Sequence, residues 1–136
     1  MAIFIGNEIK KLNTSEIFDA VSGGLVLIYQ LHTFALNVKA VITSIELRCI
    51  SATGVTDEAT VTIDIAALPI FTRVPIASTQ KLTGLLAADD RWTIPIKGGS
   101  IVVPHGGAGH IRLAFDSPAT GVSQILIADV FGYHTD

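Results

Sequence analysis

The sequence predicts an all-β protein, an antiparallel β-sandwich of jelly-roll type with eight or nine strands and at most one short helix. Three observations lead to this prediction: apolar and polar residues alternate in several segments, glycine-rich turns separate the segments, and helical periodicity is scarce. A length of 136 residues fits one domain. We therefore expect residues 1–136 to form a single sandwich, with residues 1–12 as either a candidate N-terminal arm or a first β-strand.

Four segments show the alternation of a strand that buries one face. They are residues 44–49, 60–65, 91–96 and 110–116. Pro95 has no N–H to donate to a sheet, so its strand is expected at an edge or at a bulge. Trp92 is in phase with Ile94 and Ile96, which predicts that its side chain belongs to the core.

Two further segments, residues 24–31 and 123–133, are apolar on both faces. A sandwich core covers only one face of a strand, and a contiguous exposed apolar patch usually marks an interaction site. We therefore expect the second face to pack on another subunit, although the sequence does not decide which face that is. The interface candidates are Val26, Ile28, Leu126, Ile127 and Val130, together with Ile3, Phe4 and Ile5 of the N-terminal segment.

Turn residues punctuate the chain where strands should end. They occur at residues 23–24, 52–54, 97–100, 106–109 and 117–121. Two regions are ambiguous. Asn13 and Glu16 could form the capping box of a short helix over residues 13–20, and residues 79–90 read as a long loop or a helical turn.

The composition favours a protein that works in an assembly. Only 15% of the residues are charged, against about 25% in an average soluble domain, and the mean hydropathy is +0.56. No apolar run approaches the roughly 18 residues of a membrane-spanning helix, and the start of the chain lacks the features of a signal peptide. The basic residues are dispersed and the net charge is −3, which argues against nucleic acid as a partner.

No residue pattern predicts catalysis, a cofactor or a metal site. Cys49 is the only cysteine and has Leu47 and Ile50 as apolar neighbours in a predicted strand, so we expect a packed thiol. His105 and His110 flank a glycine-rich loop, but two histidines do not complete a metal site.

The remaining candidates for chemistry are two acidic pairs and one glycine-rich loop. The pairs Asp57–Glu58 and Asp89–Asp90 are expected to be solvated turn charges whose side chains point apart. The loop 106–109 lacks the Gly-Lys-Ser/Thr ending of a phosphate-binding loop. We therefore expect a protein that is not an enzyme.

The last third of the chain has a recognisable order of elements. A glycine-rich turn precedes the strand 111–115, a Ser-Pro-Ala-Thr-Gly turn follows at 117–121, and an apolar strand closes with Val130-Phe131-Gly132-Tyr133. This order resembles the ends of small β-sandwich proteins of bacteriophage virions, especially capsid decoration or cement proteins.

The resemblance implies a structural protein on the capsid surface of a virion, made in the host cytoplasm. It would bind the major capsid protein and form a homo-oligomer, with a trimer favoured over a dimer. The alternatives are a carbohydrate-binding or other ligand-binding (lectin-like) sandwich, and a structural module of a tail or fibre.

Overall fold

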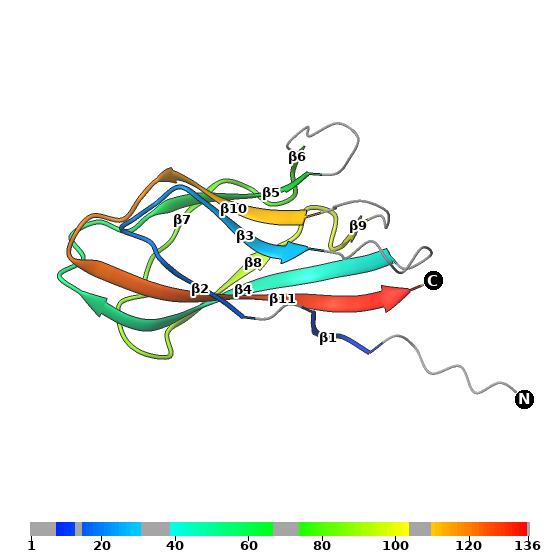
Figure 1. Ribbon diagram of the computed structural model, residues 1–136, viewed down its shortest axis with the longest axis horizontal. Helices are drawn as coiled ribbons and strands as arrows, with labels where there is room; N and C mark the ends of the chain where they lie inside the picture. The colour runs from blue at the N-terminus through cyan, green and yellow to red at the C-terminus, as the bar shows by residue number, and fades with distance from the viewer. Residues whose placement is uncertain (1–7, 13–14, 31–38, 67–73, 104–109, 136) are drawn as a thin grey trace, which may run out of the picture.

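The computed structural model describes residues 8–12, 15–30, 39–66, 74–103 and 110–135. Within these ranges every regular element is a strand, and eleven strands form two antiparallel sheets packed face to face (Figure 1). This confirms the predicted β-sandwich. The short helix expected at residues 13–20 is wrong, because residues 16–19 pair with the last strand of the chain instead.

The first sheet is built around its two longest strands, β4 (Lys39–Thr53) and β11 (Ser123–Thr135). One edge of β11 pairs in succession with β2 (Glu16–Asp19) and β1 (Lys10–Lys11). The far edge of β4 pairs with β8 (Arg91–Pro95) and β9 (Ile101–Val103). Pro95 therefore belongs to an edge strand, as its missing N–H predicts.

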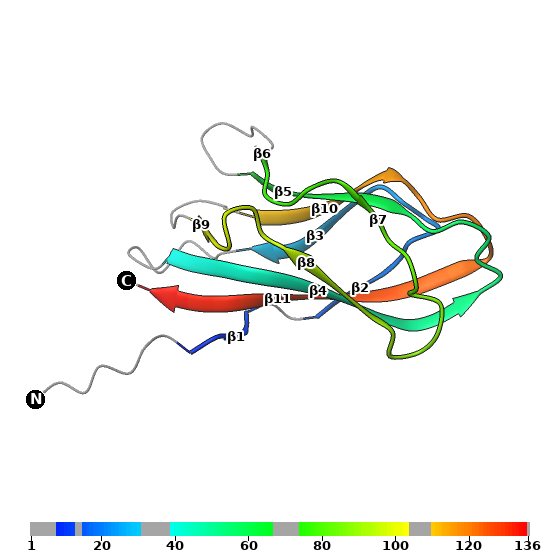
Figure 2. The same cartoon turned by 180° about the vertical axis from the view of Figure 1, so that it is seen from behind.

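The second sheet has the order β3 (Leu25–Gln30), β10 (His110–Ser117) and β5 (Thr60–Ala66). The far edge of β5 pairs with two short strands, β6 (Val74–Pro75) and β7 (Gln80–Lys81). The chain then crosses from β7 back to β8 of the first sheet, a crossing visible in Figure 2.

The connectivity is that of a jelly roll. If β1 with β2, β6 with β7, and β8 with β9 are each counted as one interrupted strand, each sheet has four strands. Chain neighbours then alternate between the sheets, except where β5 turns back into β6 and β7. This topology confirms the expected fold class.

The core lies between the two sheets. β4 and β11 contribute Leu47 and Leu126, and the opposite sheet contributes Ile63, Ile111 and Leu113, all of them fully or almost fully buried. Trp92 packs against this core as predicted, and its indole Nε1 donates to Gln80 Oε1 at 2.7 Å.

Cys49 is part of the same core and is fully buried. Burial, followed by the negative charges of Asp90 and Glu58, raises the pKa of its thiol. The thiol is therefore protonated near neutral pH and serves as a small apolar side chain, as the sequence indicated.

Gly132 fits a place in β11 where no side chain could stand. It lies opposite Ile42 of β4, and a Cβ at this position would collide with the backbone carbonyl of Val41. The closing strand can therefore approach β4 only because this residue is glycine.

Replacing Leu126 by Ala is expected to lower the free energy of unfolding by about 2–5 kcal/mol, because the substitution leaves a cavity in a fully buried site. Ile17→Ala serves as the matched control, since Ile17 is exposed on the paired strand β2 and should change stability by less than about 0.5 kcal/mol. Chemical denaturation measures both variants. Equal losses of stability would contradict the assignment of Leu126 to the core.

Candidate functional site

Four connections gather at one end of the sandwich, the left-hand end in Figure 1. They are the residues 20–24, 54–59, 82–90 and 118–122, and we call this region the loop end. Backbone hydrogen bonds join the connections to one another: Ala119 N–H donates to Ala20 C=O at 3.0 Å, and Thr56 N–H donates to Thr120 C=O at 2.8 Å. The loop end is therefore a continuous surface rather than four separate turns.

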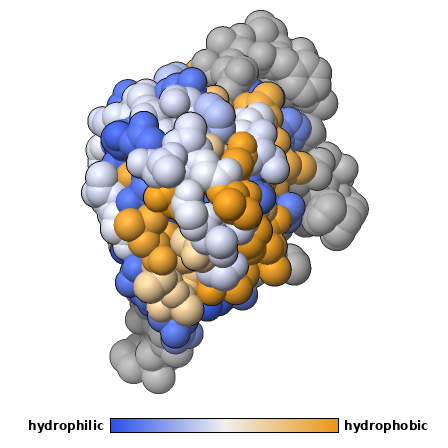
Figure 3. All heavy atoms as spheres, turned by 90° about the vertical axis from the view of Figure 1, so that its left-hand side faces the viewer, coloured by the Kyte–Doolittle hydropathy of each residue, from blue (hydrophilic) through white to orange (hydrophobic). Residues whose placement is uncertain are grey.

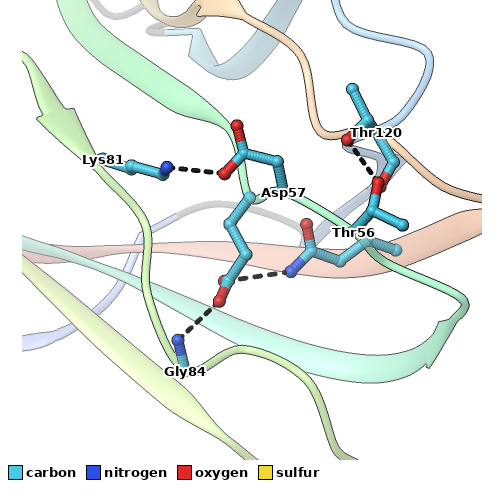
Figure 4. A network of polar contacts seen from close by, with 7 residues as sticks. Thr56, Asp57, Lys81, Gly84 and Thr120 are labelled. Atoms are coloured by element: carbon cyan, nitrogen blue, oxygen red, sulfur yellow. Dashed lines mark hydrogen bonds and ion pairs between the residues drawn. The ribbon is translucent and has the colours of Figure 1, made fainter.

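The connection before β5 and the connection before β11 are held together by direct side-chain and backbone contacts. The hydroxyl oxygens of Thr56 and Thr120 lie 2.7 Å apart (Figure 4), and Thr120 N–H donates to Asp57 C=O at 2.9 Å. Gly121 has a φ of +137°, and a Cβ there would collide with the Gly54 carbonyl. Only glycine allows this close crossing.

The carboxylate of Glu58 holds the segment that follows β7. It accepts the backbone N–H of Gly84 at 2.8 Å (Figure 4) and that of Leu85 at 3.2 Å. The fully buried Gln124 lies beside it, and its Nε2 donates to Glu58 Oε2 at 3.4 Å and to Leu85 C=O at 2.8 Å. Glu58 and Gln124 together fix this segment against β11.

Asp90 organises the end of the same segment. Its carboxylate accepts the N–H groups of Leu86 and Ala87, at 3.2 and 2.9 Å. Cys49 of β4 donates its N–H to Asp90 C=O and accepts the N–H of Asp89, at 2.8 and 2.9 Å. The segment is thus attached to both central strands of the first sheet.

The structure adds to the interpretation of the two acidic pairs. Within each pair the side chains have different partners, as expected: Asp57 binds Lys81 Nζ at 2.6 Å, and Asp89 lies 3.5 Å from Arg48 Nη1. Glu58 and Asp90 also have a structural role that the sequence did not indicate, because both accept backbone N–H groups of the loop end. These carboxylates stabilise loop conformation.

Apolar side chains are exposed on the loop end and on the adjoining end of β4. Val122, Leu86 and Ile50 are 71%, 49% and 37% exposed, and Figure 3 shows apolar residues gathered on this end with polar ones around them. An open pocket of about 230 Å³ lies between Val55, Leu86 and the Asp57–Lys81 ion pair. A fixed surface with an apolar centre and polar surroundings suits contact with another protein.

A second apolar surface lies on β3. Leu25 and Leu27 are 54% and 45% exposed on the outer face of the second sheet, beside the buried Ala114 of β10. Next to them Arg112 Nε donates to Asp64 Oδ1 at 3.1 Å, in a largely buried ion pair that joins β10 to β5.

The structure separates the residues that the sequence grouped as interface candidates. Ile28, Leu126 and Val130 are buried in the core of the chain itself, so their burial needs no second subunit. Val26 is partly buried against the same core, and Ile127 lies on the outer face of the first sheet, opposite Ile17. Ile3, Phe4 and Ile5 lie outside the described residues.

The exposed leucines of β3 escaped the sequence analysis for a physical reason. A strand that is apolar on both faces gives no phase from which its outer face can be read. In addition, the pairing of β3 with β10 skips Ile28, which stands as an extra residue between Leu27 and Tyr29. The sequence did contain a signal: within residues 24–31, Leu25 and Leu27 share the face opposite to that of Val26 and Ile28, which were chosen as the interface candidates.

Among the described residues, no three His, Cys, Asp or Glu side chains are placed together as metal ligands. His110 begins β10, whereas His105 and the glycine-rich loop fall outside these ranges. The same part of the chain contains no helix with the length and apolar character needed to cross a membrane.

No protein-family model matches the chain, and no curated protein matches it in sequence. Solved structures do match. A chain of the cyanophage Pam1 capsid asymmetric unit is 15% identical with a TM-score of 0.55, over 98% of this chain and 89% of that one. A chain of the T13 infectious bursal disease virus particle is 11% identical with a TM-score of 0.56, over 93% of this chain and 30% of its own length.

A chain of the capsid of Helicobacter pylori bacteriophage KHP30 matches with 9% identity and a TM-score of 0.48, over 95% of this chain and 99% of that one. This chain spans about a third of the infectious bursal disease virus chains that it matches. The likeness concerns the fold: the chain has a β-sandwich of the kind found in viral capsid proteins. At this level the resemblance predicted from the sequence is confirmed.

Replacing Glu58 by Ala removes the acceptor of two backbone N–H groups. We expect a loss of about 1–3 kcal/mol in the free energy of unfolding, since the N–H of the buried Leu85 loses its partner, whereas the N–H of the exposed Gly84 can bond to water instead. Amide hydrogen exchange at Gly84 and Leu85 should accelerate more than exchange in the core strands. Glu8→Ala, at an exposed position just before β1 and outside the loop end, is the control. Unchanged exchange at Gly84 would contradict the role of Glu58.

The Asp57–Lys81 ion pair predicts a pH dependence. The hydrogen bond from Lys81 and its positive charge lower the pKa of the Asp57 carboxyl below its ordinary value. A lowered carboxyl pKa stabilises the folded state above the ordinary pKa, and the contribution disappears as the pH falls through the folded-state pKa.

Lys81→Ala should therefore raise the NMR titration midpoint of Asp57 toward the ordinary carboxyl value. The stability difference between this variant and the wild type should be present at neutral pH and vanish in strong acid. Lys97→Ala, also exposed, should leave the Asp57 midpoint unchanged. Identical midpoints in wild type and Lys81→Ala would show that the ion pair does not form in solution.

Proposed function

We propose that this chain is a non-enzymatic structural protein of a virion that decorates the capsid shell and stabilises it as a cement protein. The observation that carries the proposal is the match to the cyanophage Pam1 capsid, which covers 98% of this chain and 89% of the other. A protein of similar size and fold is thus one of the chains of a capsid asymmetric unit. The proposed place of action is the outer capsid surface, after synthesis in the host cytoplasm.

The surface of the molecule supports an assembly role. The low content of charged residues and the exposed apolar side chains of the loop end and of β3 favour contact with other proteins. The proposed partners are the major capsid protein, met by the loop end, and further copies of the chain in a homo-oligomer. The sequence favoured a trimer over a dimer, and sedimentation equilibrium measures the number of subunits.

A cement protein of this kind needs no chemical step. If it binds the assembled shell and not the separate capsid subunits, it stabilises the shell by an amount set by its affinity and concentration. Several copies that bridge neighbouring capsid subunits add modest individual contacts through multivalency. A fixed loop end suits this role because less conformational entropy is lost on binding.

The N-terminal residues 1–12 are proposed as an arm toward the shell or an adjacent subunit. Lys10 and Lys11 pair with Phe131 and Gly132, so this part of the segment is the short strand β1 at the edge of the first sheet. The proposal therefore concerns the residues before it, in which Ile3, Phe4 and Ile5 would supply apolar contacts.

The competing carbohydrate-binding function usually relies on exposed aromatic side chains that a sugar can stack on, and Trp92, Tyr29 and Tyr133 are the only Trp and Tyr residues of the chain. Trp92 is partly buried and hydrogen-bonded to Gln80, and Tyr29 is buried with its hydroxyl 3.2 Å from His134 Nε2. Neither ring offers an open platform, which favours the structural role. A tail or fibre module would share the structural role and differ in the particle component that it binds.

The proposal predicts that the purified protein sediments with capsids of the phage that encodes it. Capsids that lack the protein should rupture at lower temperature, and added protein should restore the wild-type rupture temperature. A double variant with Val122→Lys and Leu86→Lys should bind more weakly, because it places charge on the apolar part of the loop end. Ile17→Lys, at an exposed site on β2, is the matched control.

A variant that begins at Glu8 keeps β1 and tests the arm separately, since it should restore the rupture temperature less than the full chain. If the wild-type protein neither sediments with capsids nor changes their rupture temperature, the decoration role is wrong. Binding in a glycan-array screen would then favour the ligand-binding alternative.

A further inference from the structure

The outer edge of β3 presents backbone groups that no described strand uses. β3 is the terminal strand of the second sheet, with β10 on its other side. Phe115 N–H donates to Gly24 C=O at 3.0 Å. Gly24 and Phe115 therefore form a hydrogen-bonded pair, and such pairs alternate along an antiparallel ladder. The next hydrogen-bonded pair is Val26 with Leu113. The N–H and C=O groups of Leu25 and Leu27, which lie between and beyond these pairs, thus point away from β10.

β3 also lacks the features that normally protect a sheet edge. Charged residues and prolines on edge strands prevent pairing with another chain. The other edge strands with described side chains each carry at least one such residue: Lys10 and Lys11 in β1, Glu16 and Asp19 in β2, Pro75 in β6, Lys81 in β7, and Arg91 and Pro95 in β8. The edge strand β9 also has neither a charged residue nor a proline, but it contains only three residues, whereas β3 with six is the longest described edge strand that lacks both.

We infer that β3 is the contact between two copies of this chain: it pairs antiparallel with β3 of a second copy, about a twofold axis at Val26. The second sheet then continues from one subunit into the other through the two β3 strands. This inference deepens the proposed function, since it rests on the proposed homo-oligomer and identifies the contact that forms it.

The positions of the free groups select this register. With Val26 on the axis, Leu25 lies opposite the partner's Leu27, and Leu27 lies opposite the partner's Leu25. Both are hydrogen-bonded pairs, because the free N–H and C=O groups of these leucines face the partner strand. The extra residue at Ile28 and the φ of +88° at Gly24 confine the regular free edge to Leu25–Leu27. Every other antiparallel register leaves at least one of the two leucines opposite a residue outside this stretch.

The side chains match the same arrangement. Leu25 and Leu27 share the outer face of the sheet, so the twofold pairing brings together four leucines that are about half exposed in one chain. No charged residue of β3 opposes another, and cross-strand apolar pairs stabilise a ladder. A twofold contact uses the same patch on both subunits and therefore closes. It favours a dimer over the trimer that the sequence suggested.

Two double variants test the register directly. Leu25→Lys with Leu27→Lys places lysine opposite lysine across the axis, whereas Leu25→Lys with Leu27→Glu places lysine opposite glutamate. Both variants alter exposed positions equally, so both should fold, as circular dichroism and thermal unfolding will show. Sedimentation equilibrium then gives the mass of each protein.

We expect a wild-type mass of twice the 14.4 kDa of one chain at micromolar concentration. The Lys/Lys variant should raise the dimer dissociation constant by on the order of tenfold or more, and the Lys/Glu variant should recover most of the loss. Hydrogen exchange supplies an independent reading: the amides of Leu25 and Leu27 should be protected only in the dimer, whereas the Val26 amide should be protected in the monomer as well.

A wild-type monomer, a trimer whose mass the Lys/Lys variant does not change, or a Lys/Glu variant as weak as Lys/Lys would each overturn the inference. A monomer that protects Leu25 and Leu27 only after mixing with capsids would mean that a strand of a capsid protein takes this edge. Capsid sedimentation of the wild type tests the decoration role separately. A dimer that does not bind capsids would therefore contradict the proposed function and leave the β3 contact intact.

Discussion

The ladder between β4 and β11 is the interaction on which the rest of the structure depends. Residues 123–135 pair with residues 39–53, and β1, β2, β8 and β9 all attach to these two strands. The ladder joins segments about 80 residues apart in sequence, so its loop-closure entropy must be overcome before the first sheet can form. The first sheet is therefore completed only when β11, the last of the described strands, pairs with β4.

This ladder also determines what the loop end can expose. Thr43 and Ile50 of β4 have no partner residue in β11, so each is a β-bulge. After each bulge the positions of β4 that point into the core change from even to odd residue numbers or back. Ile45 and Leu47 thus stay in the core, while Ile50 is turned outward next to the loop end. Part of the apolar surface there is consequently a by-product of keeping the core in register. The bulge that buries Cys49 and Leu126 as a pair is the same one that exposes Ile50.

The sequence predicts the elements whose environment is local and misses those decided by distant partners. Ile45, Leu47 and Trp92 could be assigned to the core because their strands alternate cleanly. The faces of β3 and β11 could not be assigned, since both strands are apolar on each side, and in β3 the extra residue Ile28 also shifts the phase. The capping signal of Asn13 and Glu16 favoured a helix, but pairing with residues 125–128 decides the conformation of residues 16–19. The hydrogen bonds from Gly84 and Leu85 to the Glu58 carboxylate could not be predicted from the sequence either, because the donors lie 26 and 27 residues away.

The two apolar surfaces are structurally connected, and this affects how an assembly would behave. The connection 20–24 is part of the loop end and leads directly into Leu25, the first residue of the free β3 edge. Its conformation depends on the hydrogen bond from Ala119 to Ala20 and on the positive φ of Gly23 and Gly24. Because these contacts already fix the connection, the start of β3 is held in place without any partner. If the loop end binds the shell and β3 binds a second copy, the fixed connection keeps the two contact surfaces in a constant relative position, so neither contact has to order the segment that the other uses.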